Sequence, residues 1–137
     1  VASRLAAEIY DLHIMIDSLE DDKKNTTRFL IMAADPMIPK ISDVPMITTL
    51  VFKLRSVPAA LYKALGGFAT NSINLTKLES YMRPGISERV QFYMDVEGHI
   101  DAPAMVHAME ELRFYCMKDE VKVLGTYAAS PDRHQQN

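Results

Sequence analysis

The succession of strand and helix patterns between residues 46 and 128 constrains the fold of this chain more than any other feature. Strand composition or alternation between polar and apolar side chains predicts four strands, at residues 46–54, 73–80, 89–97 and 121–127. Apolar spacings of three and four predict two helices, one starting at Ser56 or Val57 with Pro58 in its first turn, the other over residues 105–116. This order predicts an α+β fold of the ferredoxin-like βαββαβ type, in which two helices cover one face of an antiparallel sheet.

The same topology serves RNA binding, metal transport and amino-acid sensing, so the fold alone assigns no function. RNA binding needs aromatic residues at set positions on one sheet face, whereas Phe92 and Tyr93 are adjacent and lie on opposite faces. The net charge of −3 without a basic stripe also argues against nucleic acid. Metal transport needs a pair of cysteines, and Cys116 is the only cysteine. These observations argue against RNA binding and metal transport.

The chain before residue 46 has a different character. Residues 1–11 have helical apolar spacing, and residues 13–17 and 28–34 have the composition of short strands. Three prolines, at 36, 39 and 45, interrupt a segment with little periodicity. We therefore expect a domain boundary there, with residues 39–45 as the linker and residues 129–137 as a disordered tail. The chain starts without methionine inside the predicted helix, so we expect it to be part of a longer protein.

Two stretches resemble a known family. The segment Val57-Pro58-Ala59-Ala60-Leu61, with Ile-Asn-Leu-Thr-Lys-Leu-Glu-Ser at 73–80, resembles the ACT regulatory domain of prephenate dehydratases. The segment Asn-Thr-Thr-Arg-Phe at 25–29 resembles a motif near the end of their catalytic domain. Val-Leu-Gly-Thr-Tyr at 123–127 resembles the closing strand of the ACT domain. The resemblance covers nearly the whole chain in the correct order.

The resemblance implies a domain organisation and a function. Residues 1–38 would be the C-terminal fragment of an α/β catalytic domain that resembles a periplasmic binding protein, and residues 46–128 the ACT domain. The parent enzyme would convert prephenate to phenylpyruvate, with loss of carbon dioxide and water, in L-phenylalanine biosynthesis. Two alternatives remain: a stand-alone amino-acid-binding regulator without catalysis, and the C-terminal part of an arogenate dehydratase.

The catalytic candidates implied by the resemblance are Thr27, Arg28 and Asn25. Thr27 can donate a hydrogen bond to the departing hydroxide, a poor leaving group, in a dry cleft. Arg28 has the fork geometry that binds a carboxylate through two parallel hydrogen bonds. From the residues alone, a strand start with local side-chain hydrogen bonds is the favoured interpretation of the motif, and the resemblance reverses this preference for Thr27 only.

The resemblance also implies an effector site for L-phenylalanine, at the interface of two ACT domains. The candidates are Pro58, Ala59, Ala60, Leu61, Asn74, Leu75, Glu79 and Ser80. An amino acid needs amides at a helix start for its carboxylate, oxygens for its ammonium group and an apolar wall. The family's glycine after the proline is replaced by Ala59, and Tyr81-Met82 separates Glu79-Ser80 from Arg83-Pro84. A family variant with Glu-Ser-Tyr-Met at this place exists.

We expect no cofactor and no metal. Glu97, His99 and Asp101 alternate, but three ligands in one loop at this spacing are weak evidence for a metal site. The single cysteine fits a cytoplasmic protein, and no apolar run is long enough to span a membrane. The resemblance implies prephenate as substrate of the full enzyme, L-phenylalanine as effector, and a homodimer or homotetramer formed through the ACT domains.

Overall fold

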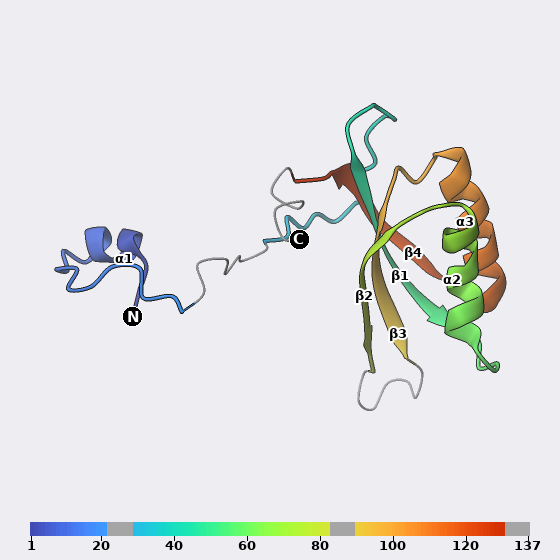
Figure 1. Cartoon of the computed structure of the whole chain (residues 1–137), viewed down its shortest axis with the longest axis horizontal. Helices are drawn as coiled ribbons and strands as arrows, with labels where there is room; N and C mark the ends of the chain where they lie inside the picture. The colour runs from blue at the N-terminus through green and yellow to red at the C-terminus, as the bar shows by residue number, and fades with distance from the viewer. Residues whose placement is uncertain (22–28, 83–89, 131–137) are drawn as a thin grey trace. The chain divides into compact units, whose positions relative to one another are not determined.

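The structure is a computed structural model that describes residues 1–21, 29–82 and 90–130 (Figure 1). The chain divides into two compact units, residues 1–31 and residues 32–135. Each unit is described by itself. The catalytic candidates Asn25, Thr27 and Arg28 lie outside the described residues, as does most of the tail predicted at 129–137.

The first unit contains one short helix, α1, at Arg4–Ile9. The hydroxyl of Ser3 caps it by accepting a hydrogen bond from the amide of Ala6, and Arg4 forms an ion pair with Asp17. The strands expected at 13–17 and 28–34 are wrong for the described residues, which have no strand structure there. A strand is stable only when neighbouring strands satisfy its backbone groups and cover its apolar side chains. Phe29 is accordingly 86% exposed.

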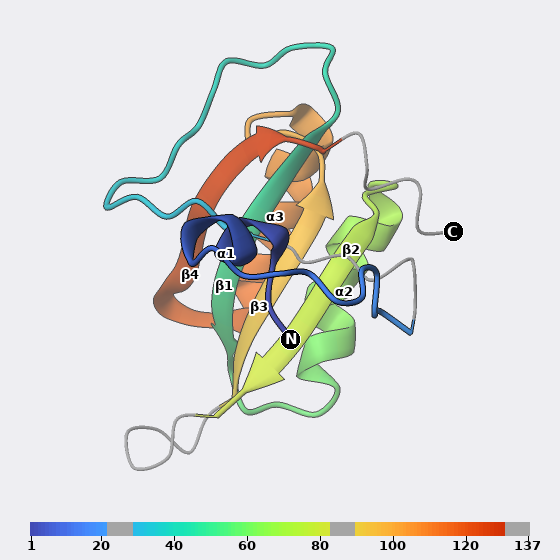
Figure 2. The ribbon, with the colours of Figure 1, turned by 90° about the vertical axis from the view of Figure 1, so that its left-hand side faces the viewer.

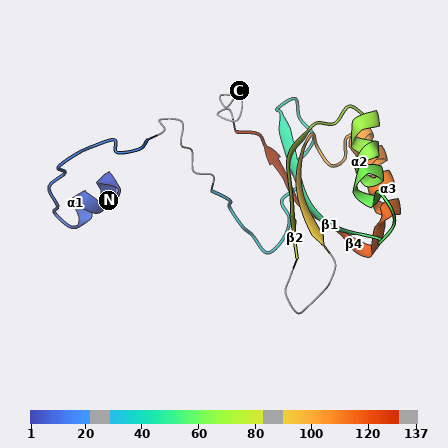
Figure 3. The same ribbon diagram turned by 60° about the horizontal axis from the view of Figure 1, so that its bottom comes forward.

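The second unit contains a four-stranded antiparallel sheet in the order β2-β3-β1-β4. The strands are β1 (Met46–Leu54), β2 (Leu75–Tyr81), β3 (Gln91–Glu97) and β4 (Cys116–Ala128). The helices are α2 (Ala60–Thr70) and α3 (Pro103–Tyr115). Both helices lie on the same side of the sheet (Figure 3). The predicted α+β, ferredoxin-like fold is therefore confirmed.

The junction between α3 and β4 differs from the prediction. The helix α3 ends at Tyr115 instead of Cys116, and β4 begins at Cys116, five residues earlier than expected. Lys118 and Asp119 do not form a turn before the strand. Asp119 has a positive φ of 60° within β4, and the pairing of β4 with β1 is irregular between Phe52 and Leu54. An irregularity of this kind lets one long strand continue through a segment whose polar composition suggests a turn.

The core lies between the sheet and the helices. Leu50 and Phe52 of β1 alternate with Thr49 and Val51, which face the helix-free side of the sheet. The rings of Phe52 and Phe92 stack with their centroids 5.3 Å apart. The buried apolar cluster consists of Leu50, Phe52, Ala64, Phe68, Met94, Val96, Met105, Ala108, Met109, Leu112 and Cys116. Its side chains follow the predicted period of two in the strands and of about 3.6 in the helices.

The two edges of the sheet differ. On the outer edge of β4, the amide of Thr126 donates a hydrogen bond of 2.8 Å to the carbonyl of Met37. On the outer edge of β2, no strand pairs among the described residues. Figure 2 shows α2 behind the β2 side of the sheet and α3 nearer β4. A free edge strand is a surface on which another strand can pair.

No helix in the described part of the chain is long and apolar enough to cross a membrane.

Candidate functional site

Four of the predicted effector residues lie where the connection from β1 enters α2: Pro58 and Ala59 precede the helix, and Ala60 and Leu61 begin it. The helix begins after Ala59, not after Ser56 or Val57 as expected, and Pro58 precedes the helix. Ala59 adopts the left-handed conformation, with φ 56° and ψ 30°, and offers no side chain to cap the helix. The first amides of a helix lack intrahelical partners, so an uncapped start favours an anionic ligand. Leu61 is half-buried and packs against the core.

The left-handed conformation of Ala59 explains why related sequences place glycine here, because a Cβ atom in this region is strained. We expect Ala59→Gly to stabilise the second unit by about 1 kcal/mol, since relief of strain outweighs the extra freedom of the unfolded glycine. Ala69→Gly, at an exposed position inside α2, should instead destabilise by about 0.5–1 kcal/mol. Urea denaturation of both variants measures this. A destabilised Ala59→Gly variant would contradict the left-handed assignment.

Asn74 and Leu75 lie at the opposite end of the second unit from this turn. The carbonyl of Asn74 accepts a hydrogen bond of 2.9 Å from the amide of Glu97, at the start of β2, and the Asn74 side chain is exposed. Leu75 pairs with Val96 and is half-buried against the core. The turn follows the end of β1, which lies at the same end of the sheet as the end of β2, because Lys53 and Tyr81 both pair with Gln91. At about 3.3 Å per residue, β2 separates the two groups by about 20 Å, which is longer than an amino acid.

Glu79 and Ser80 lie near the far end of β2 and point to different faces. Ser80 pairs with Phe92, which packs against the core, so Ser80 is on the helix-bearing face. Glu79 pairs with Tyr93 on the helix-free face, and its carboxylate lies 3.1 Å from the ammonium of Lys77. The start of α2 is on the helix-bearing side, so the geometry favours Ser80 over Glu79 as a contact to a ligand held there.

The helix-free face of the sheet contains a buried polar cluster that the sequence analysis did not identify. The hydroxyl of Thr49 donates to the carboxylate of Asp95 at 2.6 Å and lies 3.0 Å from the hydroxyl of Tyr127. Burial, and then the negative charge of Asp95, raise the pKa of Tyr93. Thr49 and Asp95 alternate along β1 and β3 with residues of the core, so the sequence pattern could place both on the other face of the sheet. It could not predict that they are buried there, because polar residues on such a face ordinarily contact solvent.

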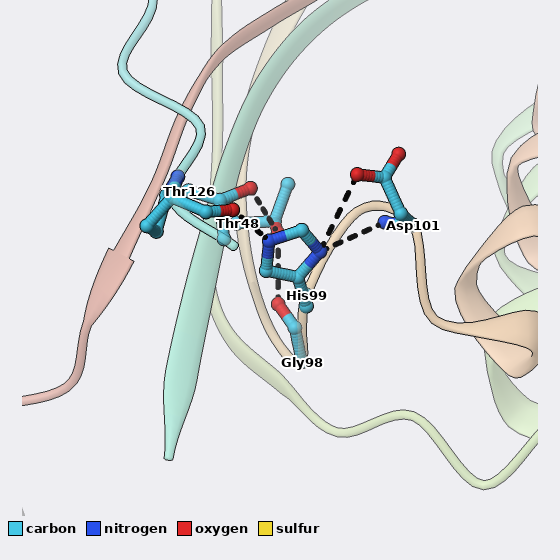
Figure 4. Close-up of polar contacts among 6 residues, drawn as sticks. Thr48, Gly98, His99, Asp101 and Thr126 are labelled. Carbon is cyan, nitrogen blue, oxygen red and sulfur yellow. Dashed lines mark hydrogen bonds and ion pairs between the residues drawn. The ribbon is translucent and has the colours of Figure 1, made fainter. Parts of the chain in front are cut away.

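The loop after β3 is organised around His99, which is 5% exposed. Its Nδ1 accepts a hydrogen bond of 3.1 Å from the amide of Asp101, so its Nε2 carries the hydrogen and donates to the carbonyl of Pro39 at 2.7 Å. Figure 4 shows His99 and Asp101 beside the bond from the Thr48 hydroxyl to the carbonyl of Gly98. Within the described ranges, no group of three or more metal-binding side chains occurs. Of the alternating residues Glu97, His99 and Asp101, whose spacing weakly suggests metal ligands, His99 and Asp101 instead take part in the hydrogen bonds that hold this loop.

Cys116 is buried at the end of α3, and burial raises the pKa of its thiol to about 11. A thiol with this pKa is almost entirely protonated at neutral pH and is therefore a poor nucleophile. Cys116 thus serves as a core residue.

Comparison with known proteins agrees with these features. The family model "Prephenate dehydratase" matches residues 1–37. A bifunctional N-acyl-homoserine lactone acylase/prephenate dehydratase from Komagataeibacter europaeus is 47% identical over 98% of this chain, which corresponds to 47% of that protein. Arogenate dehydratase/prephenate dehydratase 1 from Arabidopsis thaliana is 38% identical over 93% of this chain and 35% of that protein. The chain thus spans about a third to a half of these relatives' length.

Solved structures share the fold of the second unit. A structure described as a novel type of quorum quenching acylase has a TM-score of 0.63 and 46% identity, covering 72% of this chain and 34% of that one. A prephenate dehydratase from Arthrobacter aurescens, solved in complex with L-Phe, has a TM-score of 0.58 and 24% identity over the same shares, and it supports the fold alone. The resemblance to the C-terminal part of prephenate dehydratases, predicted from the sequence, is confirmed by the family model and the curated relatives.

Proposed function

We propose that this chain is the C-terminal part of a prephenate dehydratase, in which the second unit is an ACT domain that binds L-phenylalanine as a feedback effector. The parent enzyme converts prephenate to phenylpyruvate with loss of carbon dioxide and water. The observation that carries the proposal is the match of nearly the whole chain to enzymes named for this reaction. Several of these relatives are named as arogenate dehydratases, so arogenate is the second candidate substrate.

The effector site proposed here needs two copies of the chain. The amide of Ala60 donates to the carbonyl of Val57 at 3.2 Å, so the neighbouring amides at the start of α2 are the ones proposed for the effector carboxylate. Asn74 offers an amide oxygen for the ammonium group, but about 20 Å separates it from the start of α2 in one copy. The outer edge of β2, on which no strand pairs in the part of the chain that the structure describes, could bring the two groups together in a dimer. If two β2 strands pair antiparallel about a two-fold axis, the turn of one copy lies beside Asn74 of the other. Ser80 of the first copy then lies near the same site.

The proposal assigns catalysis and effector binding to different parts of the chain. Catalysis is proposed for Thr27, with Arg28 and Asn25 beside it, because the motif resembles one in the catalytic domain of these enzymes. The effector residues belong to a separate unit of the chain. Two distinct sites on separate units are what feedback inhibition requires, because binding at one must change the other without competition. The family model's match to residues 1–37 supports a catalytic origin for this segment.

We expect L-phenylalanine to raise the melting temperature of the 137-residue chain. At 100 times its dissociation constant, a ligand that binds only the folded state stabilises it by about 2.7 kcal/mol, which raises Tm by about 10–20 °C in a small domain. Calorimetric titration with L-phenylalanine, L-tyrosine, L-tryptophan and D-phenylalanine measures the affinity for each amino acid and hence the ligand specificity. Sedimentation gives the oligomeric state. A folded dimer that shows neither a Tm shift nor heat at millimolar L-phenylalanine would refute the proposal.

A further inference from the structure

Residues 37–45, which we call the strap, are attached to the second unit by hydrogen bonds at both ends. At the first end, the carbonyl of Met37 accepts from the amide of Thr126 at 2.8 Å, and the carbonyl of Pro39 accepts from Nε2 of His99 at 2.7 Å. At the other end, the carbonyl of Pro45 accepts from the amide of Ala129 at 2.8 Å. The strap therefore differs from a flexible linker, whose backbone groups would bond to water.

The strap approaches the helix-free face of the sheet, while its side chains Ile41 and Val44 stay 60% and 52% exposed. Ile47 belongs to that face and not to the core between sheet and helices, yet it is only 1% exposed. Ile47 lines a cavity of about 550 Å³ together with strap residues Ile41, Val44 and Pro45. Gly125 of β4 has the Met37 carbonyl oxygen 3.3 Å from the position that a Cβ atom would occupy. The absence of a side chain at Gly125 therefore permits the close approach of the strap to β4.

The side chain of His99 hydrogen bonds to the strap backbone at Pro39. Both ring nitrogens are engaged, since the Asp101 amide occupies Nδ1 and thereby fixes the hydrogen on Nε2. The ring is almost fully buried, so loss of this bond leaves the Pro39 carbonyl without its partner. The side chain of His99 thus sets where the strap lies on the second unit.

A short series of hydrogen bonds connects the proposed effector site to His99. The carbonyl of Asn74 accepts from the amide of Glu97, two residues before His99. The next residue, Gly98, is held by its amide to the carbonyl of Met46 at 2.8 Å and by its carbonyl to the hydroxyl of Thr48 at 2.8 Å. Thr48 in turn accepts from the hydroxyl of Thr126, whose amide holds the strap. These hydrogen bonds form a continuous route from Asn74 to Thr126 and the strap.

We propose that His99 is a positioning residue that holds the strap against the sheet through its hydrogen bond to Pro39. L-phenylalanine bound at Asn74 acts on the rest of the enzyme by strengthening the hydrogen bonds between the strap and the sheet. The inference rests on the proposed function, because it takes L-phenylalanine as the effector. Along the chain, the strap is the covalent connection between the N-terminal segment that contains Thr27 and the sheet. The coupling is reciprocal, so release of the strap alters the response to the effector.

Hydrogen exchange of the Thr126 amide in the 137-residue chain reports how firmly the strap is held, because this amide donates to the carbonyl of Met37. Addition of L-phenylalanine should slow this exchange at least about fivefold, the lower end of typical coupling. In His99→Ala, exchange without effector should be about tenfold faster and should no longer respond to L-phenylalanine, although calorimetry still detects binding. His99→Gln keeps an N–H donor and should restore part of the protection. The matched control His107→Ala removes an exposed histidine on α3 and should leave Thr126 unchanged.

Two further measurements test the role of the strap: hydrogen exchange in a second variant, and inhibition by L-phenylalanine in the complete enzyme. Gly125→Ala places a Cβ atom against the Met37 carbonyl and should also speed exchange at Thr126. In the complete enzyme, His99→Ala should keep kcat and KM without effector but need about fivefold or more L-phenylalanine for half-inhibition. Unchanged Thr126 exchange in His99→Ala, or effector binding that leaves Thr126 unaffected in the wild type, would overturn the inference alone. Failure of the wild type to bind L-phenylalanine would overturn the proposed function and the coupling with it.

Discussion

An equimolar mixture of the Ala60→Asp and Asn74→Ala variants is expected to bind L-phenylalanine, although neither variant binds it alone. Ala60→Asp places a carboxylate where the effector carboxylate is proposed to lie, at a first-turn position where aspartate suits a helix. Asn74→Ala removes the amide oxygen proposed to accept from the ammonium group. If each site combines the turn of one copy with Asn74 of the other, a mixed dimer has one site with both changes and one site with neither.

The mixture has a quantitative signature. Random exchange of subunits makes half of the dimers mixed, and each mixed dimer has one intact site, so about a quarter of the wild-type number of sites should return. Calorimetry after unfolding and refolding the two variants together gives this stoichiometry, and the same treatment of each variant alone is the control. If each site were formed within one copy, every chain in the mixture would carry a defect. Binding by neither the variants nor their mixture, despite binding by the wild type, would therefore refute the shared site.

The second large effect is expected at Thr27. In the complete enzyme, Thr27→Val is expected to lower kcat by about 10²–10³, the usual consequence of removing one preorganised hydrogen-bond donor to a developing negative charge. Valine has nearly the same shape, so KM should change little, because the missing bond is made only in the transition state. Thr27→Ser should retain most activity. Steady-state kinetics with prephenate, and separately with arogenate, measure these quantities.

The neighbouring residue provides the control for this substitution. Thr26→Val removes an identical hydroxyl one position earlier and should leave kcat within about threefold of the wild type, as for an ordinary surface change. If Thr26→Val were the inactive variant and Thr27→Val the active one, the assignment of the motif would be wrong by one residue. Equal activity of both variants would show that no threonine hydroxyl in this motif takes part in catalysis.

Much of the fold could be predicted because its signals are local. The alternation of β3 and the apolar spacings of α2 and α3 report which side of each element is buried, and burial in turn requires the sheet and the helices to pack together. The boundary between Tyr115 and Cys116 could not be predicted, because Cys116 suits an apolar helix face and a buried strand equally. The strand expected at 28–34 was wrong where the structure describes it, because apolar composition does not supply the partner strand that a sheet requires.

The candidate site divides in the same way. The sequence by itself determined the order of the elements, the candidate residues at the start of α2 and the start of β2, and the resemblance that names a reaction. Only the tertiary structure decided that Ala59 is left-handed, that about 20 Å along β2 separates Asn74 from the turn, and that His99 holds Pro39 sixty positions earlier in the chain. Periodicity is set by neighbours a few residues apart, whereas these three features depend on where the folded chain returns, which no local pattern specifies.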